Sequence, residues 1–431
     1  MSESKYQQII QHLKTFIESG ELATGSKVPS IRKLSQDFQC SKDTAQRALA
    51  ELRYQQYIYA KPKSGYYVLE QDQKHEDLEI RLSHDRYQAY EDFRLCVNET
   101  LIGRENYLFN YYSQQEGLED LRRSVQNLLA DQSVYAKFEE IVLTSGTQQA
   151  LYILSQIDFP NQKSQILVEQ PTYHRMNRLL SSQDLAYRTI QRGVDGIDLV
   201  ELENIFKTGR IKFFYTIPRF HYPMGHSYSR QEKLEILRLA HRYDVFIVED
   251  DYLGDLDDKR ELTFHYLDDQ NHVIYIKSFS TSLFPALRIT ALLLPQAIQQ
   301  PFIHYKSLMD YDSNLIMQKA LSLYIDNGMF ERNRLSLLKQ NQSKQAQMLE
   351  ILHKSQISLP AFPLPNALLL QLDSRINLPS LKHSGLDLDF FESAYLGTCP
   401  YQYVKIPAEE LEAILNQLCF DGKFSNQELK K

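Results

Sequence analysis

The sequence contains no tryptophan and only four cysteines among its 431 residues. Cys40, Cys96, Cys399 and Cys419 form no C-x-x-C pair and have no histidine at ligand spacing. Neither a disulfide framework nor a zinc site is therefore expected. The few scattered cysteines are compatible with a reducing cytoplasm. No apolar run approaches the roughly 20 residues that a membrane span needs. We expect a cytoplasmic protein without a membrane anchor or an export signal.

The chain is too long for one ordinary domain, and its charge is unevenly distributed. Residues 1–70 contain ten Lys and Arg and seven Asp and Glu. Of the 48 basic and 55 acidic residues in the whole chain, residues 71–431 therefore contain 38 and 48. The first seventy residues are therefore basic and the remainder is acidic. This distribution indicates that the N-terminal part is the one that binds a polyanion.

The first seventy residues show a pattern of three helices followed by a hairpin. Apolar side chains recur at helical spacing from Tyr6 to Ile17, and Gly20 ends that helix. The stretches VPSIRKLSQDFQ and SKDTAQRALAELRYQQ predict two more helices, with Ser30 and Ser41 as N-caps. YIYAKPKSGYYV then predicts two short strands around a basic turn. This order is that of a winged helix-turn-helix, whose third helix enters the DNA major groove by its N-terminal end. A small helical cap with an exposed charged face is the alternative.

The same stretch resembles the GntR family of bacterial repressors over its whole length. The matching residues are GSKVPSIRKLSQDFQCSKDTAQRALAEL and the wing KPKSGYYV. The resemblance implies binding to double-stranded operator DNA. Lys42 stands where an arginine is commoner in the family. The DNA contact at this position would then be made by a compact ammonium charge and not by the two parallel hydrogen bonds of a guanidinium. The implied DNA contacts are Ser30, Arg32, Lys42, Thr44, Arg47, Lys61 and Lys63.

The sequence then divides into a linker and a large domain. Residues 71–92 are highly charged and lack a continuous apolar face, which indicates a tether. From residue 93 to 431, apolar runs such as SQILVEQP, DVFIVEDD and HVIYIKSFS alternate with amphipathic segments such as RQEKLEILRLAHRY. This βα alternation predicts an α/β domain with a mostly parallel sheet covered on both faces. Its ligand site is expected at the carboxyl ends of the strands.

Polar residues gather at those predicted strand ends. SGTQQALYIL is a Ser-Gly turn that leads into a helix, whose free backbone N–H groups suit a phosphate. Tyr173 offers a flat surface, Asp250 and Tyr252 follow a buried strand, and Arg288 supplies a permanent positive charge. Taken singly, each has an ordinary explanation as a helix start, a packed ring, a solvated acid or a surface charge.

Their order and spacing resemble fold-type I aminotransferases, as found in the MocR subfamily of regulators, in which a GntR-like head is fused to an aminotransferase-like body. The resemblance covers residue 105 to the C-terminus, best in IVLTSGTQQAL, VEQPTY, VEDDY and SFSTSLFPALR. It implies a homodimer and a pyridoxal phosphate site. In that site Tyr173 stacks on the ring, Asp250 pairs with the ring nitrogen and Tyr252 reaches the ring hydroxyl. The phosphate is held by Gly146, Thr147, Gln148, Ser278, Ser280 and Arg288.

Several positions depart from the family pattern. Thr281 stands where the family has the lysine that forms the Schiff base, and a hydroxyl cannot form an imine. Lys277 lies four residues earlier, about 13 Å along an extended chain, so the turn would have to be rebuilt for it to substitute. Phe220 and His221 replace the usual His-Gln or His-Asn, which changes the partner of the ring hydroxyl to His221. Pro400 stands at the place of the family's carboxylate-binding arginine. Arg175 is then the remaining candidate for an effector carboxylate, although a surface role is equally compatible with its position.

We therefore expect a transcriptional regulator whose degenerate aminotransferase-like body dimerises, senses a small-molecule effector and has no enzymatic activity. The expected ligand is pyridoxal phosphate held only noncovalently, or another phosphorylated or amino-acid-like metabolite. Two alternatives stay open: an active pyridoxal-phosphate-dependent aminotransferase with a DNA-binding appendage, and a ligand-free dimerisation scaffold.

Overall fold

The computed structural model describes residues 5–54, 57–61, 64–69, 84–102, 114–257, 261–310, 314–355, 359–372 and 388–420. The chain divides into two compact units, Met1–Arg81 and Leu82–Lys431, called here the head and the body. No helix within these ranges is long and apolar enough to cross a membrane.

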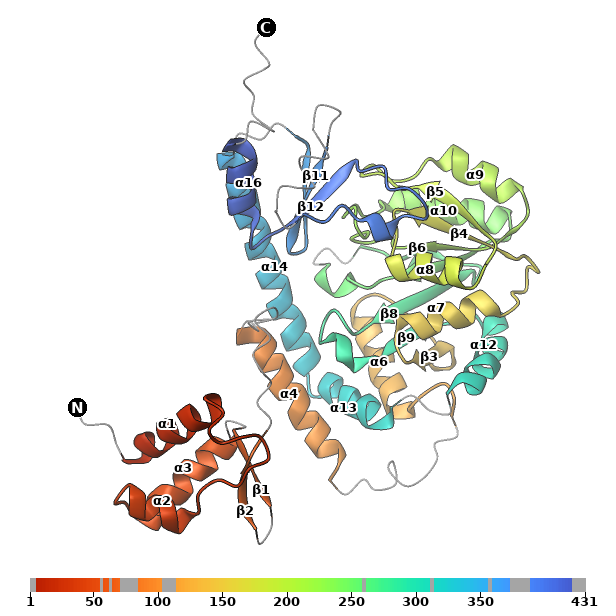
Figure 1. Cartoon of the computed structure of the whole chain (residues 1–431). Helices are drawn as coiled ribbons and strands as arrows, with labels where there is room; N and C mark the ends of the chain where they lie inside the picture. Colours follow the sequence, from red (N-terminus) through yellow and green to blue (C-terminus); the bar gives the residue numbers. More distant parts are fainter. Residues whose placement is uncertain are drawn as a thin grey trace. The chain divides into compact units, whose positions relative to one another are not determined.

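The head is a small three-helix domain with an antiparallel hairpin (Figure 1). Helix caps begin its helices where the sequence predicts them. The Ser30 hydroxyl accepts the Lys33 N–H, and the Ser41 hydroxyl accepts the Thr44 N–H. Ile9, Leu34 and Leu49 are almost fully buried, so one apolar core unites the three helices with the hairpin. The elements are α1 (Lys5–Glu18), α2 (Ile31–Asp37), α3 (Lys42–Tyr54), β1 (Ile58–Lys61) and β2 (Gly65–Val68).

The body is built on a seven-stranded sheet with the strand order β3-β9-β8-β7-β6-β4-β5. Neighbouring strands from β8 to β5 run parallel, whereas β9 is antiparallel to both β3 and β8. The predicted mostly parallel α/β domain is therefore confirmed. The strands are β3 (Ile141–Thr144), β4 (Gln165–Gln170), β5 (Tyr187–Gln191), β6 (Ile211–Thr216), β7 (Phe246–Asp250), β8 (Val273–Ser278) and β9 (Thr290–Leu293).

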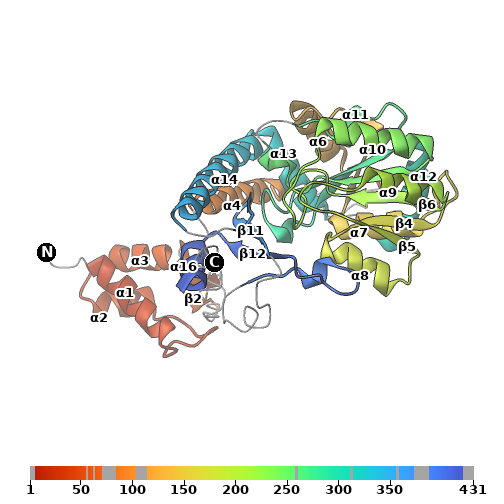
Figure 2. The same ribbon diagram turned by 90° about the horizontal axis from the view of Figure 1, so that it is seen from above.

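Helices cover both faces of this sheet (Figure 2). Alternate side chains of each central strand point to opposite faces. Phe213 and Val248 pack in the cluster that contains residues of α7, α8 and α12, whereas Phe214 and Ile247 pack with α9, α10 and α11. The helices are α7 (Thr147–Gln156), α8 (His174–Ser182), α9 (Leu199–Lys207), α10 (Arg230–Arg242), α11 (Phe264–Leu267) and α12 (Gln296–Met309).

The C-terminal part of the body is a second, smaller layer. Its strands form a three-stranded antiparallel sheet in the order β10-β11-β12, which shares an apolar core with Met348 of the long helix α14 and with Leu411 and Ile414 of α16. The elements are α13 (Leu315–Asp326), α14 (Met329–Lys354), β10 (Ala361–Leu364), β11 (Ala367–Gln371), β12 (Tyr403–Pro407) and α16 (Leu411–Phe420).

The expected linker at residues 71–92 needs a correction at its C-terminal end. Residues 84–92 form the first part of helix α4 (His84–Thr100), which belongs to the body. Phe93 is buried with Tyr324 of α13 and Phe330 of α14, and the Asp92 carboxylate lies 2.5 Å from the guanidinium of Arg332. Charged residues are so frequent in α4 that its buried face is not recognisable from the sequence. Residues 71–83 lie outside the described residues. A further helix, α6 (Glu119–Asp131), packs on the same cluster.

Candidate functional site

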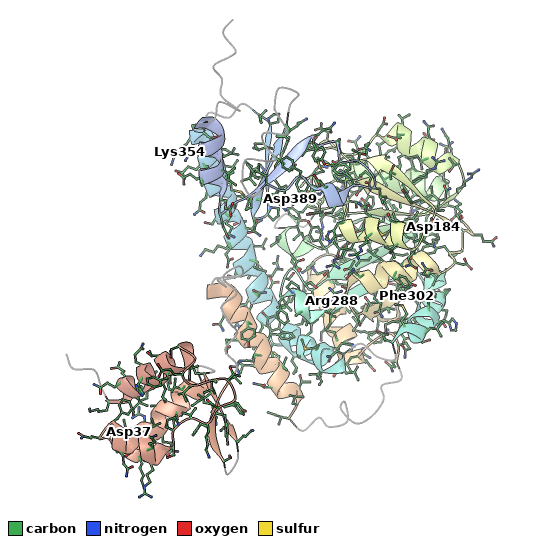
Figure 3. The ribbon with its side chains drawn as sticks, in the orientation of Figure 1. Asp37, Asp184, Arg288, Phe302, Lys354 and Asp389 are labelled. Atoms are coloured by element: carbon green, nitrogen blue, oxygen red, sulfur yellow. The ribbon has the colours of Figure 1, made fainter. Side chains whose placement is uncertain are left out.

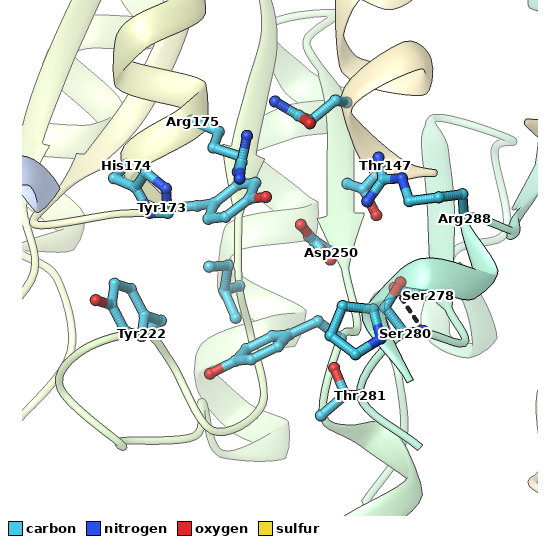
Figure 4. Close-up of a pocket in the computed structure, with 14 residues that line it drawn as sticks. Thr147, Tyr173, His174, Arg175, Tyr222, Asp250, Ser278, Ser280, Thr281 and Arg288 are labelled. Carbon is cyan, nitrogen blue, oxygen red and sulfur yellow. Dashed lines mark hydrogen bonds between the residues drawn. The ribbon is translucent and has the colours of Figure 1, made fainter. Parts of the chain in front are cut away.

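A cavity of about 380 Å³ lies at the carboxyl ends of the parallel strands (Figure 4). Loops that follow β3, β4, β6, β7 and β8 contribute its walls, which is the usual place for a ligand site in such sheets. The cavity brings together ten of the residues singled out in the sequence: Thr147, Gln148, Tyr173, Arg175, Asp250, Tyr252, Ser278, Ser280, Thr281 and Arg288. Its other lining residues are His174, Ile217, Tyr222 and Pro285.

Arg288, labelled in Figure 3, lines one part of the cavity from the loop after β8, and Gly146, on the loop after β3, lies against its guanidinium without being a lining residue itself. Gly146 precedes the first turn of α7 with φ 90°, and a Cβ atom there would lie 2.4 Å from Arg288 Nη2. Only glycine therefore allows the guanidinium to lie so close to the free N–H groups of the α7 N-terminus. Arg288 Nη2 donates to the Ser145 carbonyl at 3.4 Å. The cup of Gly146 and Arg288, with Ser278 and Ser280 beside it, has the donors that a phosphate requires.

Asp250 ends β7 at the floor of the cavity. Its Oδ2 accepts the Tyr215 hydroxyl at 2.7 Å, whereas its buried Oδ1 has no hydrogen-bond partner among the described residues. Burial raises the pKa of this carboxyl to about 7, although the hydrogen bond from Tyr215 acts in the opposite direction. A buried carboxylate oxygen without a partner is expensive, so the floor suits a ligand that brings a donor to Oδ1.

Tyrosine side chains form the walls beside Asp250. In Figure 4, Tyr173 and Tyr222 lie on one side of the cavity, and Thr281 lies on another side, next to Ser280. The Tyr252 hydroxyl donates to the Phe220 carbonyl at 3.2 Å. Tyr252 lines the cavity, and its hydroxyl oxygen can still accept a hydrogen bond, so the expected contact with a ring hydroxyl stays a prediction.

His221 also needs a correction. It does not line the cavity; it is fully buried, and its Nε2 lies 3.2 Å from Glu169 Oε2. The residue that faces the cavity from this loop is Tyr222. Phe220 has φ 49° and Gly225 has φ 73°, and this turn directs Tyr222 outward and His221 inward. No local sequence pattern indicates which of the two adjacent side chains enters the site.

Thr281 lines the cavity and is exposed, and none of the described residues that line the cavity is a lysine. Lys277 is fully buried in β8, and its Nζ lies 2.6 Å from Asp255 Oδ2. Asp255 also accepts Gln132 Nε2 at 3.0 Å and the Ser282 hydroxyl. The Lys277 amine is thus held in a buried ion pair outside the cavity. Pro400 lies away from this cavity as well, in a separate depression beside Gln170.

In the head, the expected DNA contacts are mainly exposed. Arg32 lies at the start of α2, and Lys42 and Arg47 lie on α3, all with exposed side chains. The Arg47 guanidinium also lies 5.8 Å from the centre of the Tyr6 ring. Thr44 is half-buried with its hydroxyl 2.9 Å from that of Ser41, and Ser30 is exposed. Lys61 lies at the end of β1 with its Nζ 4.8 Å from the centre of the Tyr67 ring, whereas Lys63 lies outside the described residues.

The fold and the cavity define a class of protein in which a winged DNA-binding head is joined to an aminotransferase-like body. The family of bacterial regulatory proteins called gntR matches residues 5–68, and aminotransferase class I and II matches residues 95–369. The chain belongs to the HTH-type transcriptional regulators in which these two domains are fused.

Relatives and solved structures agree with this assignment. The uncharacterized HTH-type transcriptional regulator YcxD of Bacillus subtilis (strain 168) is 41% identical over 338 residues, which are 77% of this chain and 76% of YcxD. The HTH-type transcriptional regulator NorG of Staphylococcus aureus (strain USA300) is 24% identical over 364 residues, 76% of this chain and 81% of NorG. The crystal structure of Pyrococcus horikoshii kynurenine aminotransferase matches with a TM-score of 0.69 and 23% identity, over 79% of this chain and 88% of that one. This last likeness shows the fold alone.

Proposed function

We propose that the body of this transcriptional regulator binds a phosphorylated small molecule reversibly and that binding changes the affinity of the head for operator DNA. The observation that carries the proposal is the composition of the cavity. Phosphate donors, a carboxylate oxygen without a partner and aromatic walls are present, while the described lining offers no amine nucleophile. Such a site can bind a ligand but cannot hold an aldehyde covalently.

The residues of the cavity fit pyridoxal phosphate held without a covalent bond. The cup of Gly146 and Arg288 would bind the phosphate, and Asp250 Oδ1 would accept a hydrogen bond from a protonated ring nitrogen. Tyr173 offers an aromatic face beside them. When bound to an enzyme, this cofactor supplies an electron-accepting ring. Here Thr281 stands at the position that corresponds to the family's lysine, and Lys277 is engaged with Asp255.

Arg175 is the candidate for a second anionic group of the effector. It is exposed at the start of α8 and lines the cavity. No acidic side chain pairs with it among the described residues, and its position near the rim is compatible with a carboxylate that projects from the bound ligand. A homodimer, as the family resemblance implies, would place two heads on a pseudo-palindromic operator.

The proposal is tested by DNA-binding titrations on the promoter next to the protein's own gene, with and without pyridoxal phosphate and its analogues. We expect a ligand-dependent change in the apparent dissociation constant, because a ligand that prefers one conformation shifts the equilibrium toward it. Borohydride reduction followed by peptide mapping should find no adduct at Lys277. An adduct there, or product formation from an amino acid and a keto acid, would favour the active aminotransferase. Calorimetry without binding of any phosphorylated metabolite would favour the ligand-free scaffold.

A further inference from the structure

The hairpin of the head turns one face to the core and the other face outward. Ile58 and Val68 are almost fully buried in the core, so the residues that alternate with them lie on the opposite face. These are Tyr59 and Lys61 of β1 and Tyr67 of β2. Lys61 is exposed, and both tyrosine rings are half-buried. The centres of the two rings lie 5.9 Å apart, so the rings form one continuous aromatic surface.

Lys27 adds a second lysine to this face, although it precedes the hairpin in the sequence. It forms an antiparallel bridge with Tyr67, and the next residue, Val28, is buried, so the exposed Lys27 side chain points outward beside Tyr67. A Cβ atom added at Gly65 would lie 3.4 Å from Lys27 Cε, which shows that the Lys27 side chain leans along the hairpin toward its turn. Lys61 is paired directly with Gly65 across the hairpin. We call Lys27, Tyr59, Lys61 and Tyr67 the outer face of the hairpin.

Both ammonium groups of the outer face lie beside one ring without a counter-charge. Lys61 Nζ lies 4.8 Å from the centre of the Tyr67 ring, and Lys27 Nζ lies 6.0 Å from the same centre. The ring attracts both cations but carries no net charge, so it holds them in place without neutralising them. In the part of the chain that the structure describes, neither lysine forms an ion pair with a carboxylate. The two like charges repel each other, and a bound anion would remove that repulsion.

We propose that the outer face of the hairpin binds the phosphate backbone of the operator duplex, with Lys27 as a contact that the family resemblance does not supply. The outer face continues the expected DNA-binding surface, because Lys61 belongs to that surface and Lys27 lies three residues before Ser30, the N-cap of α2. A lysine contacts a phosphate as a point charge and does not distinguish one base from another. The outer face therefore adds affinity and orients the head, while sequence selection is left to the N-terminal end of α3. Tyr67 is a positioning residue that keeps both lysines on one side of the hairpin. The inference concerns the head and is independent of the ligand proposed for the body.

Salt-dependent DNA titration of the full chain tests the inference. The probes are a duplex from the promoter next to the protein's own gene and an unrelated duplex of the same length. Lys27→Gln removes the charge and keeps a long side chain, so it should weaken binding of both duplexes by the same factor. Each phosphate contact adds about 0.9 to the slope of log K against log salt, so the slope should fall by about 0.9 in the variant. Between about 50 and 200 mM salt, the wild type should therefore lose about 3.5-fold more affinity than the variant.

The control is Arg53→Gln, which removes an exposed arginine at the far end of α3 and should leave the slope unchanged. Thermal unfolding checks that each variant is folded. An unchanged slope in folded Lys27→Gln, or a loss of affinity confined to the promoter duplex, overturns the inference.

Promoter duplexes with a single uncharged methylphosphonate link locate the phosphate that Lys27 contacts. At that position the uncharged link should weaken binding of the wild type and have little further effect on Lys27→Gln, because both changes remove the same interaction. Additive losses at every position of both strands would show that Lys27 contacts no phosphate and would overturn the inference.

Two substitutions of Tyr67 separate its positioning role from damage to the hairpin. Tyr67→Phe keeps the ring and loses only the 2.7 Å hydrogen bond between the Tyr67 hydroxyl and Ser64 Oγ, so it should bind DNA as the wild type does. Tyr67→Leu removes the ring and should weaken binding of both duplexes roughly 2- to 5-fold, with the salt slope retained because both lysines remain. Wild-type affinity in folded Tyr67→Leu would contradict the positioning role of this ring.

Discussion

Arg288→Ala tests the phosphate cup most directly. The Arg288 guanidinium lies against Gly146 so closely that a Cβ atom there would be 2.4 Å from Nη2, and it adjoins the N-terminus of α7. Charge-assisted hydrogen bonds contribute about 1.5–3 kcal/mol each, which corresponds to roughly 10- to 150-fold in affinity. Because Arg288 is exposed, we expect the lower part of this range. Arg288→Lys keeps the charge but loses the fork and should fall between the wild type and the alanine variant.

The assay is calorimetric titration with pyridoxamine phosphate and, in parallel, with pyridoxamine, which lacks the phosphate. Arg288→Ala should weaken binding of the first ligand by at least tenfold and leave binding of the second nearly unchanged. DNA affinity without ligand should also stay the same, because the head is a separate unit. Equal losses for both ligands, or no loss for the phosphorylated one, would refute the assignment of the phosphate to this cup.

Three further outcomes are expected. Arg47→Ala on the exposed face of α3 should weaken operator binding by about 1–3 kcal/mol if Arg47 contacts a base, measured against Arg53→Ala at the far end of the helix. Burial raises the pKa of Asp250 from 3.8 to about 7, so the folded state binds more protons than the unfolded state between these values. The contribution of this group to stability should therefore fall as pH rises from about 4 to about 7, and thermal unfolding of Asp250→Asn should lack that part of the pH dependence. Lys277→Met should destabilise the body by about 3–5 kcal/mol in urea unfolding, because Asp255 is left buried without its cation, and adding Asp255→Leu should recover much of the loss.

The sequence predicts those parts of the fold that depend on local signals. Ser30 and Ser41 cap helices in the structure because an N-cap needs only the side chain and the next turn of the chain. The central strands were visible as apolar runs because they are buried on both faces. Strand β5 gave no such signal, since only Ile190 among its five residues is fully buried at the sheet edge.

The candidate site could be predicted in its position but not in every side chain. Asp250 and Ser278 end strands, so their place follows from the parallel sheet. Whether His221 or Tyr222 faces the cavity depends instead on the backbone angles of this turn, in which Phe220 and Gly225 have positive φ. A one-residue difference in a turn reverses which side chain faces the cavity, and a single sequence does not encode that choice in any local pattern.

The position of Lys277 shows why its amine does not reach the cavity. Lys277 and Ser278 are consecutive in β8, so their side chains point to opposite faces of the sheet, and Ser278 is the one that lines the cavity. The Lys277 amine is fixed by Asp255 in the interior, where releasing it would leave a buried carboxylate unpaired. Under the proposed function, a ligand in this cavity is held by noncovalent contacts and dissociates when its concentration falls. The proposed reversible occupancy would let a regulator follow the concentration of a metabolite, whereas transamination would require an amine at this position.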